Sequence, residues 1–233
     1  MDAFCCGGFD LGIHSHAFPK RTGTQEAEQA GTYDGGKRSS LITGFPPRRA
    51  WPRRSAKNMT IVRPIRETDA GAFREALDAV CREGKFLAAL EAPALENVQK
   101  FIASNVKLGH PQFVAEHIGR VVGWCDAIPG EKVSGTAHIG RLGMGIVSDY
   151  RGNRIGQRLL EATIELARGV GLEKIELSVY ASNVPAICLY RKLGFRDEGL
   201  KKRGRLVDGV YDDVLLLALE LGRAEQAVHG NTH

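Results

Sequence analysis

The 233-residue sequence has no apolar run that approaches the roughly 18 residues needed to span a membrane. Its N-terminus lacks a basic region followed by an apolar core, so we do not expect a secretory signal. The five cysteines show neither an even-numbered framework nor the paired spacing of a metal site. Three of them lie within apolar patterns, as small buried side chains do: Cys81, Cys125 and Cys188. These absences favour a cytoplasmic protein with no membrane partner and no metal.

A large charge of one sign is also missing from most of the chain. The formal net charge is +5, but residues 1–58 hold nine Lys and Arg against five Asp and Glu. The rest of the chain holds 23 Lys and Arg and 22 Asp and Glu, so its charges are nearly balanced. Such a balance gives no electrostatic reason to bind nucleic acid, and we expect no nucleic-acid partner.

Residues 1–58 show no sustained apolar period of 2 or 3.6, and glycine, proline and arginine recur in "PPRRAWPRRSAKN". A segment of this kind cannot bury enough surface to offset its ordering entropy, which predicts a disordered extension. Its basic patch could contact RNA or acidic lipid, or belong to a transit peptide. The interpretation that we favour is that Met59 is the natural start. We expect one folded domain at 59–221 and a flexible tail at 222–233.

From Thr60 the apolar residues recur with regular periods. Strands are expected at 61–65, 111–117 and 120–128, the last two as a hairpin across Ile118 and Gly119. Two helices lie between the first strand and this hairpin. The first is capped by Thr68 or Asp69. The residues expected to face inward are Phe73, Ala76, Leu77 and Val80 in the first helix, and Leu95, Val98, Phe101, Ile102 and Val106 in the second.

The stretch from Ile139 to Phe195 organises the chain. It predicts a strand at 139–147, a turn and glycine-containing loop, and then a helix that ends near Gly169. A strand at 174–180, a helix from Asn183 to Gly194 and a hairpin of 196–202 with 211–219 across a 203–210 loop follow. Free backbone N–H groups at the start of the first helix make an anion site. The buried face of that helix comprises Ile155, Leu159, Leu160, Thr163, Ile164 and Ala167.

This stretch resembles the GNAT superfamily of acyl-CoA-dependent N-acetyltransferases, and its features are closest to the amino-acid and ribosomal-protein alanine acetyltransferase branch. The family loop Q/R-x-x-G-x-G/A is matched by Arg151, Ile155 and Gly156, and "ASNVPAICLYRKLGF" (181–195) is similar to the family's Asn-x-x-Ala…Tyr…Gly-Phe segment. The resemblance extends from about Thr60 to Leu219. It implies a single α/β domain of the mixed α+β kind, with a mostly antiparallel sheet of six to seven strands and about four helices. Acetyl-CoA would be the co-substrate.

The resemblance also implies roles for particular residues. The central strand would offer backbone groups to the pantetheine arm, and one of its N–H groups could stabilise the oxyanion. The following loop would bind the pyrophosphate, aided by Arg151 or Arg158. Tyr190 would donate a proton to the thiolate, and Asn183 would either contact the CoA arm or only cap its helix. The implied carrier-binding residues are Met144, Ile146, Val147, Arg151, Gly152, Asn153, Arg154, Ile155, Gly156, Gln157 and Asn183.

Arg154 departs from the family pattern, since it replaces the first glycine of the loop. If the position requires a positive φ, a residue other than glycine there costs on the order of 1 kcal/mol. Two interpretations stay open at this point. The arginine could pair with a CoA phosphate, or it could be a solvated residue in an ordinary right-handed turn.

The sequence does not identify a general base. The ribosomal-alanine branch has a glutamate where this chain has Ser178, which is too weakly basic. Glu176 lies two residues earlier, and Asp126 and His138 are further candidates that we expect to be solvated or satisfied side chains. Water could also take the proton.

The preferred hypothesis is acetyl transfer to the primary amine of a small molecule such as an amino acid, by direct attack in a ternary complex. A protein N-terminal or lysine acetyltransferase and a non-catalytic acyl-CoA sensor are the alternatives, and a homodimer is left open.

Overall fold

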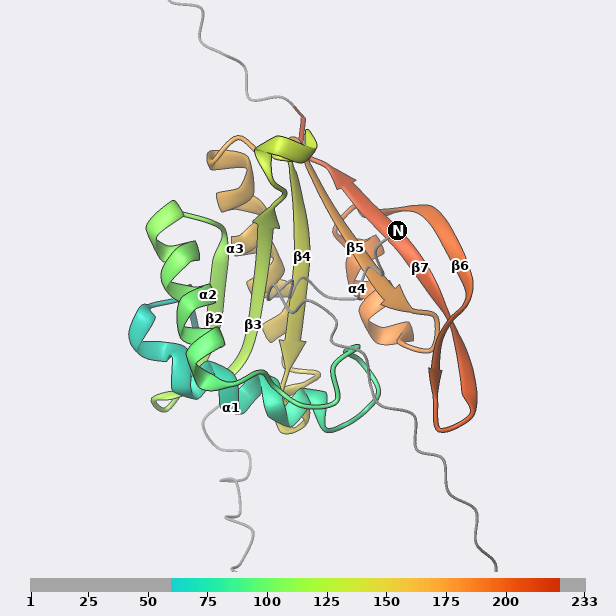
Figure 1. Ribbon diagram of the computed structural model, residues 1–233, viewed down its shortest axis with the longest axis horizontal. Helices are drawn as coiled ribbons and strands as arrows, with labels where there is room; N and C mark the ends of the chain where they lie inside the picture. Colours follow the sequence, from blue (N-terminus) through green and yellow to red (C-terminus); the bar gives the residue numbers. More distant parts are fainter. Residues whose placement is uncertain (1–59, 223–233) are drawn as a thin grey trace, which may run out of the picture. The chain divides into compact units, whose positions relative to one another are not determined.

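The computed structural model describes residues 60–222, so the predictions for residues 1–58 and for the tail from 223 onward lie outside the described part. The described residues form seven strands and four α-helices (Figure 1). In chain order these are β1 (Thr60–Pro64), α1 (Ala70–Cys81), α2 (Leu95–Leu108), β2 (Gln112–His117), β3 (Arg120–Pro129), β4 (Ile139–Ile146), α3 (Ile155–Gly169), β5 (Lys174–Tyr180), α4 (Val184–Lys192), β6 (Arg196–Val207) and β7 (Val210–Glu220).

The seven strands make one sheet with the order β1-β2-β3-β4-β5-β7-β6. Every neighbouring pair is antiparallel except β4 and β5, which run parallel. The helix α3 connects this parallel pair, as a crossover between parallel strands requires. The expected mixed α/β fold, with a mostly antiparallel sheet and four helices, is therefore confirmed.

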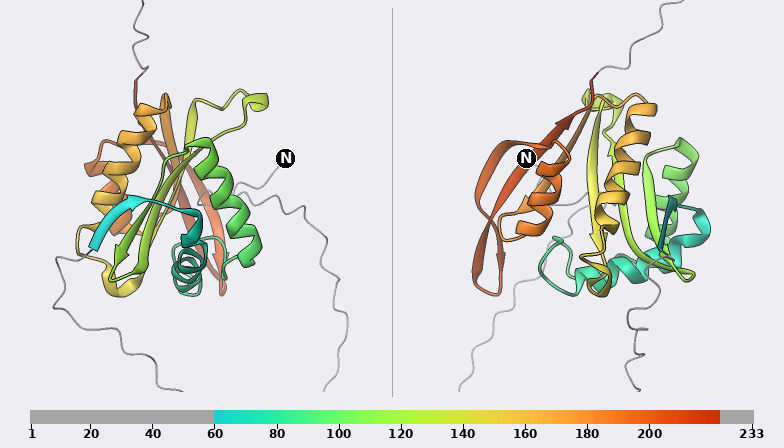
Figure 2. Two further views of the ribbon diagram at one scale, coloured as in Figure 1. Left: turned by 90° about the vertical axis from the view of Figure 1, so that its left-hand side faces the viewer. Right: turned by 180° about the vertical axis from the view of Figure 1, so that it is seen from behind.

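The helices cover the two faces of the sheet in pairs. The helices α1 and α2 lie on one face and α3 and α4 on the other, as the opposite views of Figures 1 and 2 show. Side chains along β3 alternate between the two cores that result. Cys125 and Ala127 pack in the core that contains α3 and α4, whereas Trp124 packs with Phe73 of α1 in the other. The two faces therefore have separate cores, and alternation assigns each strand residue to one of them.

The burial of α2 differs from the expected pattern. Val98 and Ile102 are fully buried, but Leu95 and Val106 are 44% and 40% exposed. The prediction that these two residues face inward was wrong. Helical spacing placed them near the apolar stripe, but the sheet covers only the middle of that stripe.

The closing hairpin is longer than expected. The strand β6 continues to Val207 through most of the predicted 203–210 loop, and the turn consists of Asp208 and Gly209. Both turn residues have positive φ, 50° and 77°. The polar, glycine-containing sequence suggested a loop, but register irregularities between Lys201 and Arg205 accommodate it within the strand.

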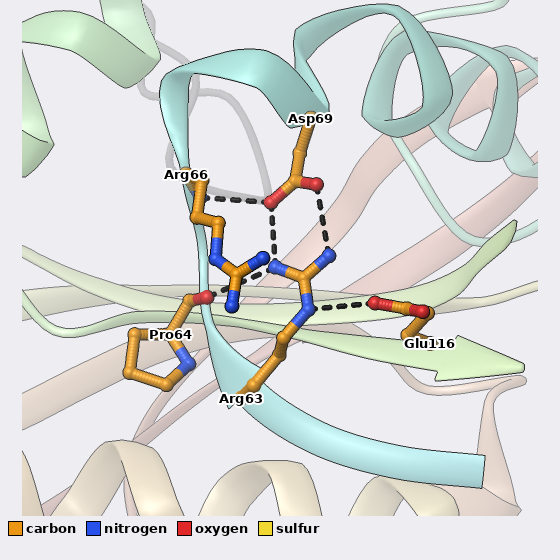
Figure 3. A network of polar contacts seen from close by, with 5 residues as sticks. All are labelled: Arg63, Pro64, Arg66, Asp69 and Glu116. Atoms are coloured by element: carbon orange, nitrogen blue, oxygen red, sulfur yellow. Dashed lines mark hydrogen bonds and ion pairs between the residues drawn. The ribbon is translucent and has the colours of Figure 1, made fainter. Parts of the chain in front are cut away.

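A network of ion pairs joins β1, β2 and the short turn before α1 (Figure 3). The Arg63 guanidinium donates to both carboxylate oxygens of Asp69, at 2.7 and 2.8 Å, and its Nε donates to Glu116 at 2.7 Å. Asp69 also accepts from the backbone N–H of Arg66 at 2.8 Å. Asp69 does occupy the N-cap position of α1, but its side chain makes no capping bond to that helix. The predicted cap residue thus serves the preceding turn and β1 instead.

Candidate active site

The strands β4 and β5 pair only at their beginnings. The parallel register covers Ile139 with Lys174, Gly140 with Ile175 and Arg141 with Glu176. Beyond these pairs, β4 continues to Ile146 along β3, and β5 continues to Tyr180 along β7. Figure 1 shows the two strands apart at this end. The edge of β4 that faces β5 therefore carries backbone N–H and C=O groups that no described strand pairs, and an extended ligand can use them.

The loop that enters α3 has an unusual backbone. Gly152 and Arg154 both lie in the left-handed region, with φ of 74° and 59°. Asn153 supports the loop by donating to the carbonyl of Tyr150 at 3.2 Å. Arg154 is therefore not in an ordinary right-handed turn, and that part of the interpretation was wrong. Its side chain is exposed and does not cap the helix, so the first N–H groups of α3 keep their anion-binding capacity.

Close packing explains the glycine at position 156. A Cβ there would lie 2.7 Å from Met144 Cε, 3.1 Å from Ile146 Cδ1 and 3.2 Å from Leu189 Cδ2. The first turn of α3 therefore rests directly against β4 and α4. This contact brings the N–H groups at the start of α3 next to the unpaired edge of β4.

Several cations surround the start of α3. Arg154 and Arg158 are exposed, and Lys192 at the end of α4 donates to Gln157 at 2.9 Å. Arg151 has a different environment. Its guanidinium bonds both carboxylate oxygens of Glu83, and its Nε donates to the carbonyl of Ile146 at 2.9 Å. Arg151 thus fixes the loop to the end of β4.

Tyr190 lies in α4, on the same face of the sheet as the start of α3. It is 8% exposed, and its ring centroid is 5.6 Å from that of Phe195. Its hydroxyl makes no hydrogen bond with another described residue. Burial raises the pKa of Tyr190 above its usual range, so the hydroxyl stays protonated and can act as a donor.

Asn183 is the N-cap of α4, and its side chain accepts from the N–H of Ala186 at 3.4 Å. The capping role is confirmed. A contact between Asn183 and the CoA arm stays a prediction.

The candidate bases lie in different environments. His138 is exposed, and Glu176 and Ser178 are partly buried on β5. Asp126 is 0% exposed, and neither carboxylate oxygen has a hydrogen-bond partner. The expectation that Asp126 is a solvated or satisfied side chain was therefore wrong. Isolated sequence patterns could not reveal this, because burial depends on the helices packed over β3.

Sequence reasoning missed the segment that follows α1. Besides the pair of Glu83 with Arg151, Arg205 of β6 donates to the carbonyl of Gly84 at 2.6 Å and to that of Leu87 at 3.4 Å. The Arg205 guanidinium also lies 4.3 Å from the ring centroid of Tyr180, at the end of β5. The segment 83–87 therefore runs from the loop after β4 to the end of β5. No apolar period marks it in the sequence.

Comparisons with known proteins identify this arrangement. A model of the acetyltransferase (GNAT) family matches residues 81–195. An L-amino acid N-acetyltransferase from Escherichia coli is 32% identical over 111 residues, which cover 47% of this chain and 68% of that protein. The chain belongs to the GNAT acetyltransferase family. Another relative, an L-methionine sulfoximine/L-methionine sulfone acetyltransferase of Pseudomonas aeruginosa, is 30% identical over 57% of this chain and 78% of its own length.

Solved structures show the same GNAT fold. A putative acetyltransferase from Salmonella typhimurium, solved with its cofactor acetyl-CoA, superposes with a TM-score of 0.66 at 20% identity, over 75% of this chain and all of that one. The family match and the acetyltransferases among its relatives show that this GNAT protein is an acetyltransferase enzyme. Among residues 60–222, no helix is long and apolar enough to cross a membrane, and no three His, Cys, Asp or Glu residues group as metal ligands.

Proposed function

We propose that this GNAT enzyme transfers the acetyl group of acetyl-CoA to the primary amine of an amino acid or a similar small molecule. The observation that carries the proposal is the unpaired edge of β4 beside the uncapped start of α3. The first can hold the extended pantetheine arm and the second the pyrophosphate. The amino-acid acetyltransferases among the relatives support the acceptor class.

The carrier would lie on the face covered by α3 and α4. Backbone groups of Met144, Ile146 and Val147 would bond the pantetheine arm, and the N–H groups of residues 152–157 would bond the pyrophosphate. Arg154, Arg158 and Lys192 would add positive charge at this end. Arg151 would hold the loop in place through Glu83, because its guanidinium is already bonded there.

The reaction needs both substrates together. The amine would approach from the face of the sheet that α1 and α2 cover, through the space where β4 and β5 separate, because the carrier would occupy the other face. Its nitrogen lone pair attacks the thioester carbon, and a backbone N–H of β4 stabilises the oxyanion. As the carbon–sulfur bond breaks, the thiolate takes a proton from Tyr190. The nitrogen loses a proton to solvent as the amide forms, and Tyr190 regains a proton from solvent.

The position of the segment 83–87 favours a small acceptor. Bonds from Arg151 and Arg205 hold this segment between the loop after β4 and the end of β5, on the path of an acceptor. A bound segment leaves less room for a folded protein than for a free amino acid. The glutamate of the ribosomal-alanine branch is also replaced by Ser178.

The proposal is tested by measuring thiol release from acetyl-CoA with L-amino acids, polyamines and peptides. We expect kcat/KM for at least one amino acid to exceed that for the peptides by tenfold or more, and initial-rate lines that intersect. Faster turnover of peptides would favour a protein acetyltransferase. Acetyl-CoA binding without thiol release for any amine would indicate a sensor, and parallel initial-rate lines would contradict the ternary complex.

A further inference from the structure

Asp126 occupies an unexpected place for a carboxylate. Cys125 and Ala127 point into the core of α3 and α4, so Asp126 between them points to the face of α1 and α2. It pairs across the sheet with Gly143 of β4. A Cβ on Gly143 would lie 2.9 Å from Asp126 Oδ1, so the carboxylate lies directly over the β4 backbone. The glycine makes room for it.

This place is the point where β4 and β5 begin to diverge. The last paired residue of β4 is Arg141, and Gly143 is two positions further along the strand. Met144, the first residue assigned to the carrier arm, follows directly. Gly143 has no side chain that could separate the carboxylate from the unpaired edge. Asp126 therefore lies beside the expected thioester position, on the face from which the amine would approach.

Polar groups around Asp126 are also left without partners. Gln112 pairs with Asp126 from β2, and its Nε2 is buried without a hydrogen bond, as is Nε1 of Trp124. The oxygen of Gln112 accepts from Asn105 at 3.3 Å, and Asn105 bonds Nδ1 of His110 at 3.1 Å. Gln112 Nε2 and the carboxylate oxygens of Asp126, on paired residues of β2 and β3, could supply at least two of the two to four bonds that a buried water needs.

Stability does not explain the carboxylate. An unpaired buried charge is costly, and the usual outcome is a pKa shift toward the neutral form. Burial does raise the pKa of Asp126 well above its ordinary range, and the nearby backbone N–H of Gly143, which lies outside hydrogen-bond geometry, offsets this only in part. The nearby titratable groups are Cys125 on the same strand, Arg141 on β4, Glu176 on β5 and His110 after α2; α1 contributes Cys81 to this core. A carboxylate whose pKa is raised takes up a proton more readily than an ordinary one, so these surroundings suit a proton acceptor.

We propose that Asp126 accepts the proton of the acceptor's ammonium group, through a water molecule bonded to its carboxylate. This inference rests on the acetyl-transfer function proposed above. One N–H bond of the ammonium breaks, its proton passes by way of the water to Oδ of Asp126, and the freed lone pair forms the carbon–nitrogen bond. After the product leaves, the carboxyl group returns its proton to solvent, so that each turnover releases one proton.

The test compares the wild type with Asp126→Asn, which keeps the shape and removes the proton acceptor. At pH 7 we expect kcat/KM for an amino acid to fall by roughly 100-fold. Above the pKa of the acceptor's amine, where the amine is already neutral, the loss should shrink to less than tenfold. Affinity for acetyl-CoA should stay within twofold, and the melting temperature should not fall, because a buried charge is removed. Thr163→Val, a buried change on the opposite face of β3, should keep the wild-type pH profile.

A second measurement uses two acceptors whose amines have different pKa values. In the wild type, the acid limb of the pH profile of kcat/KM should have the same apparent pKa for both acceptors. In Asp126→Asn, that apparent pKa should follow the pKa of each amine. A wild-type limb that follows the amine would overturn the inference even if the variant did not fold. The inference would also be overturned if kcat/KM of Asp126→Asn equalled that of the wild type at every pH, or if it were lower by the same factor at every pH. Those results would not contradict the proposed acetyl-transfer function. A wild type that acetylates no amine would contradict both that function and the role of Asp126.

Discussion

The guanidinium of Arg151, in the loop before α3, forms two parallel bonds with the carboxylate of Glu83, two residues after α1. The Nη1–Oε2 distance is 2.8 Å, and the two side chains are 34% and 24% exposed. Arg151 Cζ also lies 4.6 Å from the ring centroid of Phe86. This pair joins the expected pyrophosphate loop to the segment that we place on the proposed acceptor path, although 68 residues separate the partners in sequence.

Glu83→Gln should weaken both the fold and carrier binding. Losing a charge-assisted pair of this exposure should lower the free energy of unfolding by about 1 kcal/mol. We expect the Kd for acetyl-CoA to rise roughly threefold, because the loop amides are less fixed. Urea denaturation and isothermal titration measure the two effects. Glu96→Gln, in an exposed pair with Lys100, should change neither. Tighter carrier binding by Glu83→Gln would mean that Arg151 contacts the phosphate itself.

Arg154→Gly should distinguish the effect of the left-handed backbone on stability from the effect of the side chain on carrier binding. Glycine relieves the left-handed conformation, so the variant should be as stable as the wild type or more stable by up to about 1 kcal/mol. If Arg154 pairs with a phosphate, affinity for acetyl-CoA should fall by roughly tenfold. Asp208→Gly, at another left-handed position in the turn between β6 and β7, is the control and should leave affinity unchanged. If Arg154→Gly bound acetyl-CoA as tightly as the wild type, the Arg154 side chain would face solvent and make no phosphate contact.

Gly156→Val should disturb the contact between α3 and β4. The added side chain meets Met144, Ile146 and Leu189 at 2.7 to 3.2 Å, and overpacking of this kind costs about 1–3 kcal/mol. Affinity for acetyl-CoA should also fall, because the start of α3 and the edge of β4 move apart. Gly169→Ala at the other end of α3 is the control, since nothing lies within 4 Å of its added Cβ. That variant should be slightly more stable. Wild-type stability of Gly156→Val would contradict the packing argument.

Residues with a strong local signal were predicted well. The bounds of β5 match the expected Lys174–Tyr180, and the expected apolar face of α3 is buried from Ile155 to Ala167. Periodicity fixes such elements because the sheet and helix repeats differ. The loop before α3 was found by its resemblance to a known motif, but the left-handed backbone of Arg154 became visible only in the structure.

Features made by distant partners were not predictable. The bonds of Glu83 with Arg151 join residues that no local pattern connects, and the burial of Asp126 depends on α1 and α2 packing over β3. Gly156 shows an intermediate case. Its identity was expected from the motif, but the physical reason, close contact with Met144 and Leu189, required the packed structure.

Tyr190→Phe should slow the chemistry and leave binding and folding intact. The hydroxyl makes no hydrogen bond with another described residue, so stability should change little. Loss of a proton donor should lower kcat by roughly 10- to 100-fold while the Kd for acetyl-CoA stays constant. Because burial raises the pKa of Tyr190, its ionisation should not limit the wild-type rate below about pH 10. Thiol release and isothermal titration provide the readouts. Tyr211→Phe, at an exposed site on β7, is the control, and equal turnover in Tyr190→Phe would exclude the donor role.

Asp69→Asn should destabilise the protein in a pH-dependent way. The hydrogen bonds of Arg63 are the main cause that lowers the pKa of Asp69 below its ordinary value of 3.8. A carboxylate with a depressed folded-state pKa contributes its stability above the unfolded pKa and loses it as the pH falls through the folded pKa. The free energy of unfolding of Asp69→Asn should therefore be lower by about 2 kcal/mol at pH 5 to 7. This gap should narrow below about pH 4.

Urea denaturation at pH 7, 5 and 3 measures the gap. Glu67→Gln is a matched control, because Glu67 lies in the same turn but is exposed. It should show no comparable gap at pH 7. A gap for Asp69→Asn that stays constant down to pH 3 would mean that the carboxylate acts through its shape and neutral hydrogen bonds. A gap near zero at every pH would mean that Glu116 alone suffices to hold Arg63.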